Sequence, residues 1–323
     1  MKRAALGGTA PLFDEMVPDP RLERALLALD GLSVGDALGE RFFERPAEAV
    51  RRIEARQLPE RPWRYTDDTE MALAITETLA HHGRIHPGVL AVGFCDRYRR
   101  DPQRGYGAGA HDVLGRIGRG EPWQVVAASA FDGQGSRGNG AAMRAAPVGA
   151  FFADDADRVV EEARASAAVT HAHRDGQAGA IAVALAAAWA CWRASGRRLS
   201  EGLLAFVAAR TPAGPTREGL ERAAALWARG GDVTVHGAAR ELGNGSEVLS
   251  SDTVPFALWS AAKHLESFEE TFWATVSALG DRDTTCAIAC GVVALAVGRE
   301  GIPPAWLAQR EPLALTLPSS AAT

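Results

Sequence analysis

The stretch AGAIAVALAAAWACW, residues 178–192, is fifteen residues long and contains no charged side chain. Its large apolar residues recur at helical spacing, since Ile181, Leu185 and Trp189 lie four residues apart. A helix that is apolar on all sides is buried in a large core or spans a membrane, and a span needs about 20 residues. We therefore predict that this stretch is a central core helix of a globular protein.

The same helical spacing continues over most of the chain. Further examples are Leu22, Leu26 and Leu29; Met71, Ile75 and Leu79; and Val113, Leu114 and Ile117. Strict alternation of apolar and polar residues over a strand length is hard to find, and the β-branched residues lie in Ala-rich segments that favour helix. No fixed-period repeat indicates a solenoid. The sequence predicts an all-α fold in a single compact domain.

Clusters of Gly, Pro and polar residues indicate where the helices are interrupted. These clusters lie near residues 46–62, 100–109, 133–140, 174–176, 211–215, 243–251 and 279–283. None resembles a flexible interdomain linker, so one helical domain is expected to cover residues 20–318. Residues 1–19 and 319–323 show no periodicity, and we expect a mobile N-terminal segment and a short mobile tail.

The charge distribution argues against two classes of partner. The chain of 323 residues has a formal net charge of -5, and its Lys and Arg residues are scattered along the sequence. A protein that holds a nucleic-acid backbone usually carries a basic stripe, so sequence-specific binding of nucleic acid is not expected. No apolar run is long enough for a membrane span, so a membrane is not expected as a partner either.

The cysteines and the N-terminus indicate a cytoplasmic protein. Four cysteines in a chain of this length do not make a disulfide scaffold, and none forms a CxxC pair. Cys286 and Cys290 are one helical turn apart, but no second pair would complete a zinc site, which favours buried core thiols. The first sixteen residues contain no apolar run of signal-peptide length.

Two distant segments share an unusual start. YTDDTEMALA, residues 65–74, and GDRDTTCAIACGVVALAVG, residues 280–298, each place paired acids and threonines before an apolar helix. In the simpler interpretation, Thr66 or Asp67 caps a helix and Glu70 completes a capping box. In the second, both helix starts direct carboxylates and hydroxyls at one volume, where divalent cations offset their repulsion. Because Cys and His are absent from both starts, such a site suits Mg²⁺ or Mn²⁺.

Three further stretches could contribute to a site. GQGSRGNGAAMRAAPVG, residues 133–149, is either a structural turn or a glycine-rich loop that receives a phosphate at a helix N-terminus. GLSVGDALGERF, residues 31–42, contains glycines that allow close helix packing, and its Asp36 would need a partner on an apolar face. In THAHRDG, residues 170–176, His171 or His173 either faces the site or caps a helix.

In this order, the five stretches resemble the ADP-ribosylglycohydrolase family, in particular its dinitrogenase reductase-activating glycohydrolase branch. The matching residues are GDALG at 35–39, TDDTEMALA at 66–74, GNGAAMR at 138–144, TH at 170–171 and GDRDTTCAIACG at 280–291. The resemblance implies an all-α, orthogonal helical fold with a cleft for ADP-ribose. It also implies two Mg²⁺ or Mn²⁺ ions at the base of that cleft.

The resemblance further implies roles for individual residues. The implied metal ligands are Thr66, Asp67, Asp68, Asp281, Asp283 and Thr284. The implied contacts to ADP-ribose are Gly138, Asn139, Gly140, Met143 and His171. In the activating branch, the loop that matches RGYGAGA (residues 104–110) carries an acid, and here Tyr106 is the candidate substrate contact. A typical member also has a glutamate about four residues after GDALG, where this chain has Phe43 between Glu40 and Glu44.

These residues lead us to expect an enzyme that hydrolyses the bond between C1″ of ADP-ribose and an acceptor, with a modified arginine as the leading candidate. Asp67, Asp68 and Asp283 would be the catalytic carboxylates, and the substrate would be an ADP-ribosylated protein or a small ADP-ribose conjugate. Two alternatives stay open. One is a scaffold that binds ADP-ribose or a nucleotide without turnover. The other is hydrolysis of another ADP-ribose linkage or of the diphosphate.

Overall fold

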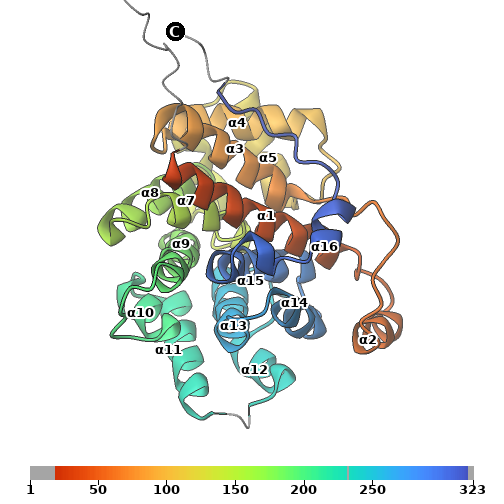
Figure 1. The fold of residues 1–323 in the computed structure, drawn as a ribbon. Coiled ribbons are helices and arrows are strands. Elements are labelled where there is room, and N and C mark those ends of the chain that lie inside the picture. Colours follow the sequence, from red (N-terminus) through yellow and green to blue (C-terminus); the bar gives the residue numbers. More distant parts are fainter. Residues whose placement is uncertain (1–18, 231–232, 319–323) are drawn as a thin grey trace, which may run out of the picture.

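The computed structural model describes residues 19–230 and 233–318, and these residues form helices joined by short loops (Figure 1). Within them there are two isolated β-bridges and no strand. The α-helices are α1 (Pro20–Glu40), α2 (Pro46–Glu54), α3 (Asp67–His82), α4 (Pro87–Arg100), α5 (Ala108–Gly118), α6 (Trp123–Gly133), α7 (Ala146–Phe151), α8 (Ala156–Ala168), α9 (Arg174–Ala194), α10 (Leu203–Arg210), α11 (Pro215–Ala228), α12 (Val235–Leu242), α13 (Ser250–Lys263), α14 (Phe268–Ser277), α15 (Arg282–Val297) and α16 (Pro304–Gln309). The prediction of an all-α fold is confirmed.

Helix α9 is the predicted central core helix. Residues 182–188 have no exposed surface, and the helix packs against α7, α8, α10, α13 and α15. Its Ala-rich sequence lets neighbouring helices approach closely while it retains a high helix propensity. In the described part of the chain, no helix combines the length and the apolar character needed to cross a membrane.

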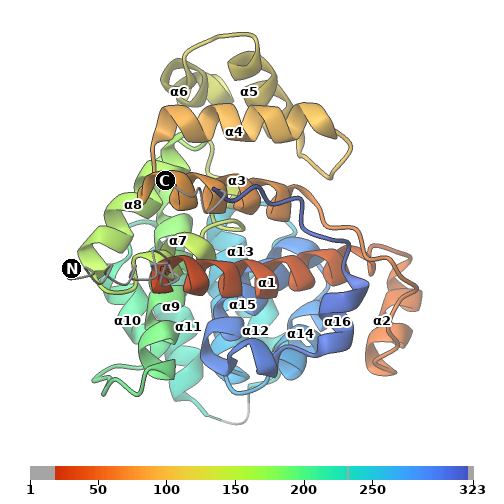
Figure 2. The same ribbon diagram turned by 45° about the horizontal axis from the view of Figure 1, so that its top comes forward.

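Helices α1 and α15 lie side by side in the middle of the molecule (Figures 1 and 2). Three glycines spaced by four residues form the contact face of α1, namely Gly31, Gly35 and Gly39. A Cβ on Gly35 would lie 2.4 Å from the carbonyl oxygen of Cys286, and one on Gly39 would lie 2.6 Å from that of Arg282. The two backbones therefore touch, which places Asp36 close to the start of α15. Cys286 and Cys290 are buried and free, so their interpretation as core thiols is confirmed.

A second part of the core is aromatic and joins α1, α14, α15 and α16. Trp306 of α16 makes edge-to-face contacts with Phe272 and Trp273 of α14, at ring-centroid distances of 5.4 and 6.1 Å. Trp63, just before α3, lies 6.3 Å from the same Trp306 ring. This cluster fixes the segment that leads into TDDT against the C-terminal helix.

Some boundaries differ from the expectation. The cluster at 46–62 includes α2, which has few buried apolar residues, namely Ala49 and Ile53, so its periodicity is weak in the sequence. Asp19 accepts a hydrogen bond from the backbone N–H of Arg21 and caps α1, while the rest of the expected mobile segment, residues 1–18, lies outside the described residues. The expected tail, residues 319–323, lies outside them as well.

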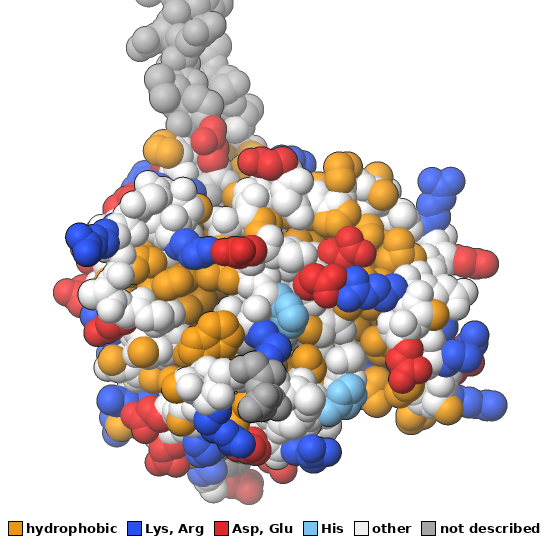
Figure 3. All heavy atoms as spheres, turned by 60° about the horizontal axis from the view of Figure 1, so that its bottom comes forward, with side chains coloured by type: hydrophobic (Ala, Val, Ile, Leu, Met, Phe, Trp, Pro, Cys, Tyr) orange, Lys and Arg blue, Asp and Glu red, His pale blue; other side chains and the backbone are white. Residues whose placement is uncertain are grey.

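The face of the molecule that comes forward in Figure 3 carries acidic and basic side chains interspersed with apolar ones. This mixture agrees with the scattered distribution of Lys and Arg in the sequence. On this face, no continuous basic stripe of the kind that binds a nucleic-acid backbone is visible.

Candidate active site

Helix α3 begins at the TDDT motif. Thr66 is its N-cap, and the Thr66 hydroxyl accepts a hydrogen bond from the N–H of Asp68 at 3.4 Å, so the expected capping role is confirmed. Glu70 does not close a capping box, because its carboxylate instead accepts a hydrogen bond from Arg97 at 2.8 Å. Asp67 and Asp68 are both buried in the first turn, where the helix dipole favours negative charge.

Asp36 of α1 holds this helix start in place. Its carboxylate accepts hydrogen bonds from the backbone N–H groups of Thr66 and Thr69, at 3.0 and 3.1 Å, and from both threonine hydroxyls. The side chain has no exposed surface, and burial raises its pKa to about 6 although these hydrogen bonds oppose the shift. The expectation that Asp36 requires a partner is therefore confirmed, and the partner is TDDT.

The start of α15 is held by two asparagines. Asp281 is the N-cap residue, and its N–H donates to the carbonyl of Asn244 at 3.1 Å. The side-chain amide of Asn139 donates to Asp281 Oδ2 at 2.7 Å and to the hydroxyl of Thr253 at 3.0 Å. Asn139, implied as a substrate contact, thus orients one of the implied metal ligands. Thr284 is buried in the first turn of the helix.

The two acid-bearing helix starts face each other. The pKa of Asp68 is raised well above its usual range by burial and then by the charges of Asp283, Asp36, Asp67 and Asp281. Burial, together with Asp36 and Asp281, raises the pKa of Asp67 to about 8. The pKa of Asp283 is raised by burial and by Asp281. The structure therefore brings together residues that are more than 200 positions apart in the sequence.

The donor atoms of this cluster fit hard divalent cations. All are carboxylate or hydroxyl oxygens, and Asp68 Oδ1 is buried without a hydrogen-bond partner. Within the described ranges, no three Asp, Glu, His or Cys side chains have closed into a metal-binding group. The ligand set that the resemblance implies also includes the hydroxyls of Thr66 and Thr284, which are not part of such groups.

The glycine-rich loop packs against His171. A Cβ on Gly140 would lie 3.3 Å from the imidazole Cε1 and 4.0 Å from the sulfur of Met143, and one on Gly138 would lie 3.5 Å from Nε2. The N–H groups of Gly138 and Asn139 donate to Ser136 and Val248, so these two amides already have partners inside the protein.

The imidazole of His171 lies beside Gly138 and Gly140, whereas His173 approaches the loop at Gly135 through its backbone N. The Nδ1 atom of His171 is 2.7 Å from the hydroxyl of Thr170, and burial followed by the charge of Arg144 lowers the pKa of His171 to about 3. The imidazole is therefore neutral at physiological pH. His173 has the alternative role that the sequence allowed, since it caps α9 by accepting a hydrogen bond from the N–H of Asp175.

Arg144 supplies buried positive charge beside the acids. Its guanidinium donates to the Thr170 hydroxyl at 2.9 Å and lies 4.4 Å from the centroid of the Phe94 ring. Burial lowers the pKa of Arg144 to about 9, while the negative charge of Asp67 opposes the shift. The positive charge of Arg144 therefore offsets part of the repulsion between the adjacent acids Asp67 and Asp68.

The 101–107 loop covers Asp67 from the other side. The N–H of Asp67 donates to the carbonyl of Arg104 at 2.6 Å. Gly105 adopts φ +85°, and a Cβ there would lie 3.3 Å from Asp67 Oδ1. Tyr106 is buried, packs edge-to-face on Tyr98 and has no hydrogen-bond partner for its hydroxyl. Burial and the charge of Asp67 raise its pKa, which places Tyr106 beside the acid cluster.

The family model for ADP-ribosylglycohydrolase matches residues 17–320 of this chain. The chain belongs to the ADP-ribosylglycohydrolase family. The resemblance inferred from the five motifs is therefore confirmed, and a glycohydrolase enzyme is supported.

Individual ADP-ribosylglycohydrolase relatives agree with this assignment. ADP-ribosylhydrolase ARH3 of Xenopus tropicalis is 32% identical over 269 residues, covering 75% of this chain and 76% of the relative. ADP-ribosylhydrolase ARH3 of Homo sapiens is 30% identical over 268 residues, with 75% and 73% covered. A solved structure described as an ADP-ribosylglycohydrolase-related protein complex superposes with a TM-score of 0.63 at 26% identity, covering 90% of this chain and 93% of the other. The predicted fold class is confirmed.

One edge of the site departs from the pattern of the ADP-ribosylglycohydrolase family. Phe43 is 49% exposed, and the guanidinium of Arg282 lies 4.7 Å from its ring centroid. Of the two flanking acids, Glu44 pairs with Arg52 at 3.0 Å. Glu40 is the last residue of α1, and burial and then the charge of Asp36 raise its pKa to about 7.

Sequence reasoning missed residues that only the fold brings to the site. Asn244 and Thr253 support Asp281 from a segment that the sequence indicated only as a helix boundary. Within the last turn of α6, Phe131 has the non-helical angles φ +53° and ψ 56° and is 62% exposed. The Asp132-Gly133 pair that follows it is a turn signal in the sequence.

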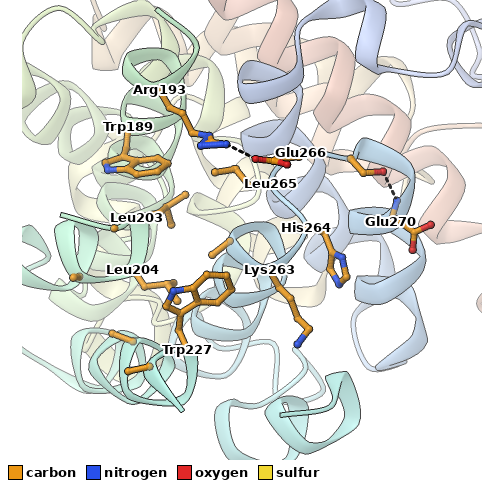
Figure 4. A pocket seen from close by; sticks show the side chains of 16 residues that line it. Trp189, Arg193, Leu203, Leu204, Trp227, Lys263, His264, Leu265, Glu266 and Glu270 are labelled. Atoms are coloured by element: carbon orange, nitrogen blue, oxygen red, sulfur yellow. Dashed lines mark hydrogen bonds and ion pairs between the residues drawn. The ribbon is translucent and has the colours of Figure 1, made fainter. Parts of the chain in front are cut away.

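A cavity of about 750 Å³ lies elsewhere, between α9, α10, α11 and the end of α13 (Figure 4). Trp189 and Trp227 line it together with Leu203, Leu204 and Lys263. None of the acids at the starts of α3 and α15 contributes to it. The cleft for ADP-ribose that the resemblance implies stays a prediction.

Proposed function

We propose that this member of the ADP-ribosylglycohydrolase family hydrolyses the bond between C1″ of ADP-ribose and an acceptor side chain, and that the reaction requires Mg²⁺ or Mn²⁺. One observation carries the proposal: the carboxylates that begin α3 and α15 lie close enough together for acids at the start of α15 to raise the pKa values of Asp67 and Asp68, with these two buried and Asp281 and Asp283 partly buried. Four neighbouring carboxylates repel one another, and Arg144 and the N-terminus of α3 offset only part of this repulsion. Divalent cations bound between them would offset the remaining repulsion.

The residues that would hold two cations share oxygen donors and a place at the two helix starts. They are Thr66, Asp67, Asp68, Asp281, Asp283 and Thr284. When bound, the cations would orient the ribose hydroxyls and a water molecule, lower the pKa of that water and stabilise charge at the sugar.

The protein's own carboxylates supply the proton acceptor in this proposal. Asp68 and Asp283 both have pKa values raised by burial, and Asp67 has a pKa of about 8. Bound cations would lower these pKa values, so the carboxylates would be ionised and one of them could take a proton from water. The usual spacing rules for two glycosidase carboxylates need not apply, because cations share the work.

Around these acids, neutral groups would orient the ADP-ribose. His171 is an uncharged imidazole beside Gly138 and Gly140, so it can donate or accept a hydrogen bond without adding charge. Tyr106 offers a hydroxyl without a partner near Asp67. Asn139 acts on the substrate only indirectly in this arrangement, because its amide holds Asp281.

The first conjugate to test is arginine-linked ADP-ribose, because modified arginine is the leading candidate acceptor from the sequence analysis. The Arg282 guanidinium beside Phe43 would repel a cationic acceptor at that edge, so a serine-linked conjugate belongs in the same experiment. Incubation with arginine-linked, serine-linked and nucleic-acid-linked ADP-ribose, with and without a chelator, would identify the linkage by mass spectrometry. Release of intact ADP-ribose would indicate glycosidic cleavage, and release of AMP would indicate cleavage of the diphosphate. Binding of a conjugate without any product would indicate a scaffold.

The proposal is tested by replacing Asp67 and Asp283 separately with Asn. Each change removes one anionic ligand while preserving side-chain shape, so cation affinity measured by calorimetry should fall more than about tenfold, together with ADP-ribose release. Asp112→Asn is the matched control, because Asp112 is an exposed acid of α5 that faces Arg116 at 3.8 Å. Undiminished affinity and turnover in both Asp67→Asn and Asp283→Asn would refute the proposal.

A further inference from the structure

After α16 the chain turns back and runs along α3 in an extended conformation (Figures 1 and 2). We call residues 310–316 the C-terminal strap. At its beginning, the N–H of Glu311 donates to the carbonyl of Trp63 at 2.9 Å. At its end, the N–H of Thr316 donates to Glu77 of α3 at 2.8 Å. The strap therefore spans α3 from before its first turn to beyond its middle.

Glu311 is the strap residue nearest to TDDT. Its carboxylate accepts a hydrogen bond from the N–H of Tyr65 at 3.0 Å and forms an ion pair with Arg104. The Arg104 guanidinium also donates to the carbonyl of Tyr65 at 2.8 Å and lies 4.5 Å from the centroid of its ring. The side chains of Glu311 and Arg104 are 19% and 13% exposed, so solvent screens this pair less than a surface pair.

Each partner of Glu311 is connected directly to a candidate metal ligand, one by a peptide bond and the other by a hydrogen bond. Tyr65 immediately precedes Thr66 in the chain, and the carbonyl of Arg104 accepts the N–H of Asp67 at 2.6 Å. The Arg104 side chain is fixed further by Asp101, whose carboxylate lies 3.1 Å from its Nε. One carboxylate thus fixes the two backbone segments that orient Thr66 and Asp67.

We propose that Glu311 is a positioning residue for the catalytic centre, acting on Thr66 and Asp67 through Tyr65 and Arg104. It touches neither the substrate nor the reacting atoms. The expected change in kcat rests on the proposed function, because a small displacement of Thr66 and Asp67 would alter kcat only if TDDT is part of the active site. Cation affinity provides a second measure that does not depend on turnover.

The test compares Glu311→Ala and Glu311→Gln with the parent protein. A displaced Asp67 should lower kcat about tenfold in Glu311→Ala, with KM within about twofold of the parent, because misplaced groups affect the transition state most. Cation affinity should fall in the same variant. The kcat and cation affinity of Glu311→Gln should lie between those of the parent protein and Glu311→Ala, since the amide oxygen of Gln can still accept a hydrogen bond from the N–H of Tyr65.

Glu77→Ala is the matched control. It removes the other carboxylate that anchors the strap, yet Glu77 has no contact with Tyr65, Thr66 or Asp67 among the hydrogen bonds of the described residues. We expect parental kcat and cation affinity in this variant. An equal loss in Glu77→Ala and Glu311→Ala would overturn the inference, since any loosening of the strap would then suffice.

A double variant tests the route through Arg104. If Glu311 acts mainly through Arg104, adding Glu311→Ala to Arg104→Ala should lower kcat little further. Losses that multiply fully, or parental kcat and cation affinity in Glu311→Ala, would overturn the inference. A parent protein that releases no ADP-ribose from any conjugate refutes the proposed function instead, and cation affinity then decides the role of Glu311. Should Glu311→Ala not fold, Glu311→Gln carries the same comparison.

Discussion

At the level of single residues, the adjacent acids of TDDT are tolerated because several neighbouring groups stabilise their negative charge or position the motif. The N-terminus of α3 favours Asp67 and Asp68, Arg144 lies nearby as a buried cation, and Asp36 uses its oxygens to hold the threonines. The remaining repulsion appears as raised pKa values. These residues are therefore arranged to take up protons or cations.

Asn139 allows a sharp test of this arrangement. In Asn139→Asp, the N–H donor to Asp281 at 2.7 Å is replaced by a second carboxylate. The lost hydrogen bond and the added repulsion should lower the free energy of unfolding of the chelator-treated protein by about 1–3 kcal/mol, as measured by denaturant titration. Gln134→Glu introduces the same charge in the same loop at an exposed position near Arg137, and we expect a change within about 0.5 kcal/mol. Equal stability of Asn139→Asp and the parent would contradict the role assigned to Asn139.

At the level of elements, the contact between α1 and α15 sets the geometry of the site. Asp36 lies on α1, one residue after Gly35, and the acids Asp281 and Asp283 begin α15. Because Gly35 contacts the backbone of α15 directly, the distance between these acids depends on the absence of a side chain at that position. Packing and chemistry are coupled here through one helix pair.

Gly35→Ala should separate the two helices. Its Cβ would lie 2.4 Å from the carbonyl oxygen of Cys286, and overpacking of this kind typically lowers the free energy of unfolding by about 1–3 kcal/mol. Gly88→Ala is the control, because no atom lies within 4 Å of a Cβ at that position in α4. The control should be neutral or more stable by up to about 1 kcal/mol, owing to its better helix propensity. Equal effects in the two variants would show that the α1–α15 contact can relax.

At the level of the whole molecule, the buried acids connect stability to pH. The folded-state pKa values are about 7 for Glu40 and about 8 for Asp67, above the usual 4.5 and 3.8. Between the unfolded and folded pKa values, the folded protein binds more protons than the unfolded chain, so the stability that these two acids contribute falls as pH rises from about 4 to about 8 and is constant above that range. His171, with a pKa of about 3, acts in the opposite direction, but only below its unfolded value of 6.5.

We therefore expect the chelator-treated protein to lose stability between about pH 6.5, above which His171 no longer opposes the trend, and about pH 8, and to level off at higher pH in denaturant titrations. Asp67→Asn should show a smaller loss over the same range, since one of the titrating groups has been removed. Added Mg²⁺ should stabilise the parent more at the higher pH, because cations require deprotonated ligands. A stability that rises with pH in the presence of chelator would contradict the raised pKa values.

Much of the fold could be predicted from local sequence patterns. Helical spacing around Ile181 identified α9, and the same periodicity gave the all-α class, because burial of one helix face is visible in a short window. α2 was missed because its two buried residues, Ala49 and Ile53, are too few to make a pattern. For the site, the five motifs identified the family and the two acid-bearing helix starts.

The sequence by itself determined that this chain is helical, that its core contains α9 and that TDDT and GDRDTT begin helices with unusual acids. Only the tertiary structure decided that Asp36 holds TDDT, that Asn139 holds Asp281 and that Glu311 reaches Tyr65 across the molecule. The physical reason is the range of the interactions. Helix periodicity and capping act between residues at most four apart, whereas these hydrogen bonds join segments that only the packing of α1, α15 and the C-terminal strap brings together.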